Sequence, residues 1–384
     1  MKISILLPYK ENFSSEYAGA VSIFIKETTL KSKFINSTMI YGNTNYKKDY
    51  LKNYINIELN KKTIFQSNST LYVNNFVKNK SVKKSDIIEI HNRPVYLSKI
   101  LKIKKAKKVL YFHNNPLEMN GSKSIKERLF LIEKLNKIIF NSEWTKKQFL
   151  KGLPKLYFKI DKLIVIYQST NKPVVNFKKK EKIITFVGKL NKAKGYDLFG
   201  EAAVKILNNY KDWRVEVVGD ELREQIIFNH DRFNINGFQK HKKVLSIFKK
   251  TSIAVICSRW NEPFGRTSLE ASSNGCASIV SDRGGLLETN SGALILRDLT
   301  IKNLYQLIRK LIINKTLRNK LQKKSIDNFY LTHKFVAKQI DNYRKGFFII
   351  NKVKKKKLKI IHITNFNDRH DGRLFFNTGR RINN

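Results

Sequence analysis

Several protein classes are excluded by what the chain contains little of. The only cysteines are Cys257 and Cys276, and their spacing fits no disulfide framework, redox motif or zinc motif. Glycine (17) and proline (6) are too scarce for a collagen-like or linker-like chain. No apolar run approaches the roughly 20 residues of a membrane-spanning helix. The apolar stretch before Pro8 is shorter than the core of a signal peptide, so we expect a reduced, cytoplasmic protein.

The chain also has few acidic residues. Asp and Glu number 30 against 76 Lys and Arg, which gives a formal net charge of +46. One interpretation is a composition bias that favours Lys, Asn and Ile along the whole chain. Another is a partner that carries negative charge, such as an anionic membrane surface on the inner face of the cytoplasmic membrane, or an acidic acceptor. A nucleic acid is not expected as a partner, because no nucleic-acid-binding motif is present.

Enough apolar material is present for two domains. The chain has 384 residues, of which 41% are hydrophobic and 11% aromatic, and a domain commonly takes about 100–200 residues. Short apolar runs alternate with helix-like segments, a pattern typical of parallel sheets in α/β proteins. The runs expected to form strands are 2–9, 87–90, 108–112, 138–140 and 163–167 in the first half, and 183–187, 213–218, 233–237, 253–257, 277–280 and 294–296 in the second.

The two sets of strands predict a first domain at 1–168 and a second at 169–334, joined by the polar, Lys-rich stretch 168–182. A helix at 335–350 is expected to return to the first domain. Residues 351–384 begin with a basic spacer, and 359–366 is similar to the opening strand of the chain. This segment is either the start of a further domain or a tail that docks on the first domain.

The segment from Asn261 to Gly275 (NEPFGRTSLEASSNG) contains the densest chemistry. Pro263 suits the first turn of a helix and Gly275 its C-terminal end, which puts Glu262 at the helix mouth and Glu270 about two turns further in. Gly265 lies where free backbone N–H groups and the helix dipole attract an anion. A carboxylate can accept hydrogen bonds from the hydroxyl groups of a sugar or ribose.

This segment resembles the motif of the family 4 retaining glycosyltransferases, which belong to glycosyl transferases group 1. The family has the GT-B fold of two facing Rossmann-like domains with parallel sheets, and the resemblance covers roughly residues 1–350. Further agreement comes from Gly188-Lys189-Leu190 with Lys194-Gly195, from Val217-Val218-Gly219-Asp220 and from Gly284-Gly285-Leu286-Leu287-Glu288. Lys189 stands where the family usually has Arg, and a lysine binds phosphate without bidentate geometry.

The resemblance implies a role for each matched residue. Glu262 would act in catalysis next to the transferred sugar, and Glu270 would bind the ribose of the donor. Lys189 and Lys194 would hold the donor diphosphate, where charge-assisted hydrogen bonds are strong. The remaining residues expected to bind the donor are Gly19, Gly219, Phe264, Gly265, Arg266, Gly284, Gly285 and Glu288. Gly19 would supply the first-domain loop, which more often has a glycine pair in the family.

Two histidines follow strands in the first half. His113 precedes Asn-Asn-Pro at a strand end, so a role in the cleft is favoured over a structural one, and in the family a histidine in this region approaches the transferred sugar. His91 has the same flanking pattern one strand earlier, where a structural role is favoured. The two cysteines are expected to be small core residues. No cluster has metal-ligand spacing, so we expect metal-independent chemistry with no cofactor.

These patterns predict an enzyme of the hexosyltransferase type. It would move a sugar from a nucleotide-diphosphate donor, UDP- or GDP-linked, to a glycan or lipid-linked acceptor, as in the synthesis of surface polysaccharide or lipopolysaccharide. Two alternatives stay open. One is a sugar-nucleotide epimerase, which also has two facing Rossmann-like domains. The other is a non-catalytic basic module that binds a membrane or nucleic acid on a degenerate transferase fold.

Overall fold

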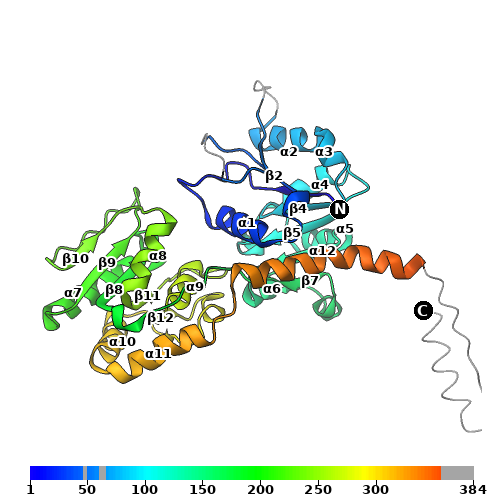
Figure 1. Ribbon diagram of the computed structural model, residues 1–384. Helices are drawn as coiled ribbons and strands as arrows, with labels where there is room; N and C mark the ends of the chain where they lie inside the picture. Colours follow the sequence, from blue (N-terminus) through cyan, green and yellow to red (C-terminus); the bar gives the residue numbers. More distant parts are fainter. Residues whose placement is uncertain (46–49, 60–65, 356–384) are drawn as a thin grey trace, which may run out of the picture. The chain divides into compact units, whose positions relative to one another are not determined.

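The computed structural model describes residues 1–45, 50–59 and 66–355 (Figure 1). Two parallel sheets are present, which confirms the predicted α/β class. The first sheet has seven strands in the order β3-β2-β1-β4-β5-β6-β7 and the second has six in the order β10-β9-β8-β11-β12-β13. In both sheets the chain starts in the middle, runs to one edge and then returns to continue toward the other edge, as in doubly wound folds.

The first sheet and its helices form the first lobe. Its strands are β1 (Ile3–Leu6), β2 (Thr38–Gly42), β3 (Tyr54–Asn56), β4 (Ile87–His91), β5 (Lys107–Phe112), β6 (Lys137–Phe140) and β7 (Leu163–Val165). Its helices are α1 (Ala20–Lys31), α2 (Asn68–Lys78), α3 (Lys80–Lys83), α4 (Leu97–Ile100), α5 (Ile125–Lys134) and α6 (Glu143–Leu150). Strands β1, β4, β5 and β6 are buried along almost their whole length, because helices cover both faces of a parallel sheet.

The second sheet and its helices form the second lobe. Its strands are β8 (Glu181–Val187), β9 (Arg214–Val218), β10 (Phe233–Ile235), β11 (Thr251–Ile256), β12 (Ala277–Ser281) and β13 (Leu294–Leu296). Its helices are α7 (Tyr196–Asn209), α8 (His241–Lys250), α9 (Arg266–Ser273), α10 (Ile301–Ile313) and α11 (Lys315–Asp327). Cys257 and Cys276 are fully buried in this core, as predicted.

The last helix, α12 (His333–Lys355), is longer than the expected 335–350. Up to Arg344 it belongs to the same compact unit as both lobes. Arg344 donates two hydrogen bonds to the carboxylate of Glu89 on β4, at 2.7 and 2.8 Å, and both side chains are buried. Asp341 accepts hydrogen bonds from the Ser32 hydroxyl (2.6 Å) and the Lys33 N–H. These polar contacts fix the helix on the first lobe, since removing one partner would leave a buried charge unpaired.

Residues 356–384, which include the stretch that is similar to the opening strand, lie outside the described residues. Within the described ranges no helix is both long and apolar enough to cross a membrane.

Candidate functional site

Two adjoining pockets lie at the carboxyl ends of the strands. The inner pocket has a volume of about 250 Å³, and Lys194, Glu262 and His113 are among its lining residues. The outer pocket has a volume of about 410 Å³, and Lys189, Gly219 and Glu270 are among its lining residues. Both pockets are lined by Ala20 and Arg266, so they lie next to each other. Since residues of both lobes line them, a ligand placed here would contact both sheets.

Helix α9 does not begin at Pro263, as the sequence suggested. It begins at Arg266, because Gly265 adopts a left-handed conformation (φ 103°) as the N-cap. Glu262 therefore lies in the segment before the helix, where it forms a bridge with Gly284. A side chain at Gly284 would put its Cβ 2.1 Å from the Glu262 carbonyl oxygen. The predicted helix end is confirmed, since Gly275 follows the C-cap with φ 69°.

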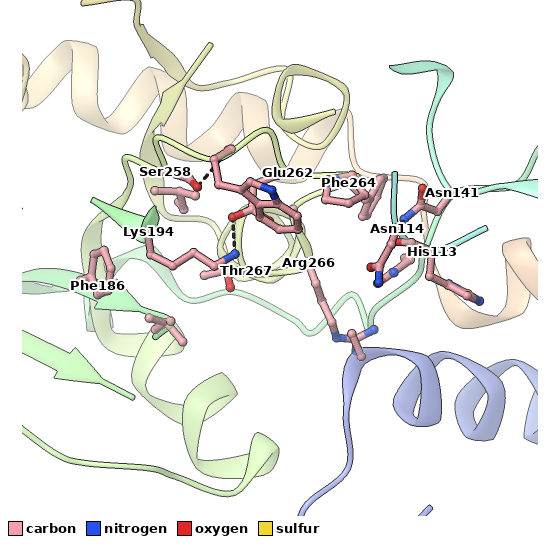
Figure 2. A pocket seen from close by; sticks show the side chains of 18 residues that line it. His113, Asn114, Asn141, Phe186, Lys194, Ser258, Glu262, Phe264, Arg266 and Thr267 are labelled. Atoms are coloured by element: carbon pink, nitrogen blue, oxygen red, sulfur yellow. Dashed lines mark hydrogen bonds and ion pairs between the residues drawn. The ribbon is translucent and has the colours of Figure 1, made fainter. Parts of the chain in front are cut away.

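Glu262 forms an ion pair with Lys194 at the wall of the inner pocket. Its Oε1 lies 2.5 Å from Lys194 Nζ, and that ammonium also stands 4.8 Å from the centre of the Trp260 ring. Figure 2 shows the pair on one side of the pocket and His113, Asn114 and Asn141 on the other. Lys194 is carried by the turn before α7, where the Asn191 side chain accepts a hydrogen bond from the Lys194 N–H. The lysine thus reaches the pocket from a fixed turn.

Arg266 stands between the two pockets. Its Nε lies 2.7 Å from Glu270 Oε1 as an ion pair, although the angle does not meet hydrogen-bond geometry. Nη1 and Nη2 have no hydrogen-bond partner among the described residues, and only 11% of the side chain is exposed. In Figure 2 the guanidinium extends from α9 toward the start of α1. A buried guanidinium with unpaired nitrogens is costly alone, which favours an anionic ligand here.

Glu270 is held by two cationic or proton-donating groups. It accepts a hydrogen bond from His241 Nε2 at 2.8 Å, in addition to its contact with Arg266. Burial by itself would raise the pKa of Glu270, but the charge of Arg266 and the His241 hydrogen bond outweigh it, so the pKa lies below its usual value. Glu270 is therefore a buried carboxylate at the wall of the outer pocket. His241, on α8, was missed in the sequence, where no local pattern links it to Glu270.

Gly219 allows a close approach at the floor of the outer pocket. It has φ 140°, and an added Cβ would lie 1.8 Å from the Gly188 carbonyl oxygen. Its N–H donates to the Gly237 carbonyl at 2.9 Å. A substitution here would push apart the loops after β8 and β9. The exposed Lys189 lies next to Gly188 and lines the same pocket.

The start of α1 lies beside both pockets. Gly19 is the N-cap of α1, and an added Cβ would lie 2.6 Å from Glu11 Oε1. That carboxylate accepts hydrogen bonds from the N–H (3.2 Å) and hydroxyl (2.9 Å) of Ser22 in the first turn of α1. Gly19 itself is not among the pocket-lining residues, but the adjacent Ala20 lines both pockets.

Glu288 lies elsewhere than expected. It is absent from the lining of both pockets, and its carboxylate accepts hydrogen bonds from the N–H groups of Glu143 (2.7 Å) and Trp144 (2.8 Å) at the start of α6. Beside it, the Ser142 hydroxyl donates to the Pro263 carbonyl at 2.5 Å, next to Gly285. We call Ser142, Glu288, Pro263 and Gly285 the interlobe clasp. Gly284 thus lies against the backbone of Glu262, and Gly285 lies in the clasp. Neither glycine lines either pocket.

A substitution in the interlobe clasp can show whether Glu288 stabilises the fold or binds the donor. Glu288→Gln replaces one acceptor oxygen by an amide NH2 group, which donates and cannot accept from a helix N–H, so we expect the free energy of unfolding to fall by about 1–2 kcal/mol. Nucleotide affinity should stay unchanged. Urea unfolding and calorimetric titration with UDP would measure the two quantities. Glu143→Gln is the matched control, because it removes an exposed charge from the same helix start. Lost affinity with unchanged stability would show that Glu288 touches the donor.

The chain is similar in sequence to known proteins, most clearly in its second lobe. Residues 168–327 match the family model described as glycosyl transferases group 1. A putative glycosyltransferase, YtcC of Bacillus subtilis (strain 168), is 22% identical over 291 residues, which cover 68% of this chain and 67% of YtcC. Spore coat protein SA of the same strain is 27% identical over 162 residues, which cover 38% of this chain but only 43% of that protein.

The fold is similar to those of solved structures. The crystal structure of Anabaena Alr3699/HepE in complex with UDP and glucose superposes with a TM-score of 0.68 at 14% identity, covering 90% of this chain and 99% of that one. At this identity the likeness shows the fold alone, which is the predicted GT-B type. Together with the match of the second lobe, it relates the chain to the glycosyltransferases at the level of the superfamily.

Proposed function

We propose that the protein is a retaining glycosyltransferase of family 4, which moves a sugar from a nucleotide-diphosphate donor to a glycan or glycolipid acceptor. The observation that carries the proposal is the guanidinium of Arg266, which has unpaired nitrogens and lines two adjoining pockets. A diphosphate beside it would place the ribose toward Glu270 in the outer pocket and the sugar toward Glu262 and His113 in the inner pocket. The superfamily relation supports the same activity and favours neither alternative considered from the sequence.

The reaction needs a stabilised leaving group. When the bond between the anomeric carbon and the diphosphate oxygen breaks, its electron pair goes to the diphosphate. The acceptor hydroxyl oxygen forms the new bond to the anomeric carbon, and its proton goes to the leaving diphosphate. The cations around the two pockets, Arg266, Lys189 and Lys194, then face the growing negative charge. Free N–H groups at the start of α9 add a positive dipole end. Preorganised charges of this kind cost no rearrangement during the reaction, so they lower its barrier.

The retaining outcome is supported by the lack of a strong base across the inner pocket. Glu262 is the sole carboxylate among the residues that line this pocket in the described chain, and Lys194 neutralises it. His113 stands on the opposite side, but burial lowers its pKa to about 3, which makes it a poor general base. An inverting transferase would need a competent base on the acceptor side to deprotonate the attacking hydroxyl.

The donor can be identified by a binding experiment. A ligand that binds only the native state raises the melting temperature, and a ligand at 100 times its Kd adds about 2.7 kcal/mol of stability. We expect one member of a panel of UDP-, GDP- and ADP-sugars to give the largest shift, and that shift to disappear in Arg266→Met. A panel with no shift for any nucleotide sugar would refute the proposal.

Catalysis is proposed to be independent of metal ions. The described residues contain no group of three or more His, Cys, Asp or Glu that could hold a metal ion. Arg266, Lys189 and Lys194 can supply the charge that a cation would otherwise bring to the diphosphate. We therefore expect EDTA to leave both the melting-temperature shift and the rate of transfer unchanged. Loss of transfer with EDTA, restored by Mg²⁺ or Mn²⁺, would contradict this expectation.

The proposal includes an anionic membrane surface. The protein would bind this surface and reach a lipid-linked acceptor there. A hollow in the first lobe supports it, since its lining contains no carboxylate within the described residues. Its lysines come from α2, α3 and α4 and the loop before β5: Lys78, Lys83, Lys99, Lys102, Lys104 and Lys105. A cluster of like charges attracts anionic surfaces and is screened by salt. The cytoplasmic location stays a prediction from the sequence.

A further inference from the structure

Strands β4 and β5 end in the same four-residue pattern. His91-Asn92-Arg93-Pro94 begins with the last residue of β4, and His113-Asn114-Asn115-Pro116 follows β5. The two strands are neighbours in a parallel ladder that pairs His91 with Tyr111. The two turns therefore lie side by side at the sheet edge, and only the second reaches the inner pocket, through His113 and Asn114.

The first turn holds the second through its side chains. His91 Nδ1 lies 2.9 Å from His113 Nε2, so the two rings share one hydrogen bond. Asn92 Oδ1 accepts from the backbone N–H groups of His113 (3.1 Å) and Asn114 (3.2 Å). Asn92 has φ 57°, a left-handed conformation that asparagine tolerates better than most residues. His91 in turn stacks on Tyr111 with ring centres 4.3 Å apart.

We propose that His91 and Asn92 are positioning residues that fix the tautomer and orientation of His113, so that His113 presents an Nδ1–H to an oxygen of the transferred sugar. The inference rests on the proposed function, because it assigns a sugar to the inner pocket. It adds a role to His91, which contacts neither pocket and was favoured as a structural residue from the sequence.

The tautomer follows from counting protons. Two neutral imidazoles carry two ring protons on four nitrogens, and one proton lies in the hydrogen bond between them. The other sits on His91 Nε2 or on His113 Nδ1, and neither nitrogen has a partner among the described residues. His91 is 1% exposed, so a proton on Nε2 would be an unsatisfied buried donor. His113 Nδ1 is itself buried, but the His113 ring lines the inner pocket, whereas His91 lines neither pocket. The pocket side of the pair is the side that a ligand can reach, so we place the second proton on His113 Nδ1.

Burial keeps both rings in the neutral form that this count requires. It lowers the pKa of His113 to about 3, and burial together with the charges of His113 and Arg344 lowers the pKa of His91 well below its usual value. Because the hydrogen bond at one ring nitrogen decides which nitrogen is protonated, His91 would set the state of His113. Without that bond, His113 would be free to take the Nε2–H tautomer.

The deciding measurement needs no substrate. In protein labelled with ¹⁵N at its seven histidines, long-range ¹H–¹⁵N spectra distinguish protonated from bare ring nitrogens, and His113→Gln assigns the His113 signals. We expect His113 to carry its proton on Nδ1 in the wild type. His91→Leu should shift it to Nε2 or to a mixture, whereas His91→Asn, whose amide can donate from near the Nδ1 position, should restore Nδ1–H.

Kinetics then test the consequence for transfer. With the donor found in the nucleotide-sugar panel, we expect His91→Leu to lower kcat by about 10–100-fold with little change in nucleotide affinity, and His91→Asn to recover most of it. Asn92→Gly should also lower kcat, because glycine keeps the left-handed backbone but removes the Oδ1 acceptor. Melting curves separate these effects from loss of the fold.

Two results would overturn the inference. One is a wild-type His113 that carries its proton on Nε2. The other is a His91→Leu protein that is folded and leaves the His113 tautomer unchanged. Failure of the proposed function would look different, since no nucleotide sugar would bind while the tautomer in the free protein could still be as described.

Discussion

Replacing Arg266 by methionine is expected to lower kcat for sugar transfer by about 10²–10³-fold, the usual effect of removing one preorganised group from a developing negative charge. Arg266 is the cation with unpaired guanidinium nitrogens that lines both pockets. Methionine keeps most of the side-chain volume and removes the charge. Steady-state kinetics with the donor from the panel would measure kcat and KM separately.

Two further variants make this result specific. Arg309→Met makes the same chemical change at an exposed position of α10 and should leave kcat unchanged. Arg266→Lys keeps a positive charge but loses the planar fork, so its kcat should lie between those of the wild type and Arg266→Met. A folded Arg266→Met protein that transfers sugar at the wild-type rate would place the diphosphate elsewhere.

The fold could be predicted because parallel strands leave a strong signal. The run 253–257 is apolar throughout and the run 108–112 is apolar after Lys108, since both faces of each strand are buried, and the structure has β11 and β5 there. The runs missed were β2 and β3. The three residues of β3 are half-buried or exposed at the sheet edge, so they form no continuous apolar run. Edge strands of this length lack the pattern on which the prediction depends.

The site was harder to predict where its contacts are distant in sequence. Lys194 and Glu262 were each identified, but their pairing joins residues 68 positions apart. His241 reaches Glu270 because α8 packs beside α9. The spacing of residues in the sequence does not predict that these two helices are neighbours. Glu288 had the right motif but was given a contact with the donor, whereas its carboxylate lies on the N-terminus of α6 in the other lobe. Local motifs identify residue types, and lobe packing decides their partners.

Helix α9 shows how one backbone conformation changes a site. The Pro263 pattern predicted a helix that includes Glu262 near its mouth. Gly265 instead turns the chain with φ 103°, in a place where an added Cβ would lie 2.4 Å from Leu286 Cδ2. Glu262 is therefore held by its bridge to Gly284 and by Lys194, and is independent of the helix. The sequence contains the glycine, but its left-handed conformation, which moves the helix start to Arg266, is seen only in the structure.

Replacing Glu270 by alanine is expected to weaken donor binding by about 10–150-fold, because a hydrogen bond to a charged group is worth about 1.5–3 kcal/mol. Glu270 is buried in the wall of the outer pocket, and its pKa lies below the usual value, so it is ionised at neutral pH and can accept from a ribose hydroxyl. Calorimetric titration would compare UDP with its 2′,3′-dideoxy analogue on both proteins.

The comparison of the two nucleotides isolates the ribose contact. If Glu270 accepts from a ribose hydroxyl, the wild type should prefer UDP over the dideoxy analogue, and Glu270→Ala should bind the two almost equally, since the variant has already lost that hydrogen bond. Glu201→Ala, an exposed carboxylate on α7, controls for the change in net charge. If folded Glu270→Ala prefers UDP as strongly as the wild type does, another residue binds the ribose. The diphosphate site at Arg266 would still be tested by the Arg266→Met variant. Because Glu270 and Arg266 form an ion pair, the loss of affinity in Glu270→Ala also includes an effect on Arg266. The difference between the two nucleotides therefore isolates the ribose contact, and agreement of this result with that of Arg266→Met would fix the direction in which the donor lies across the pockets.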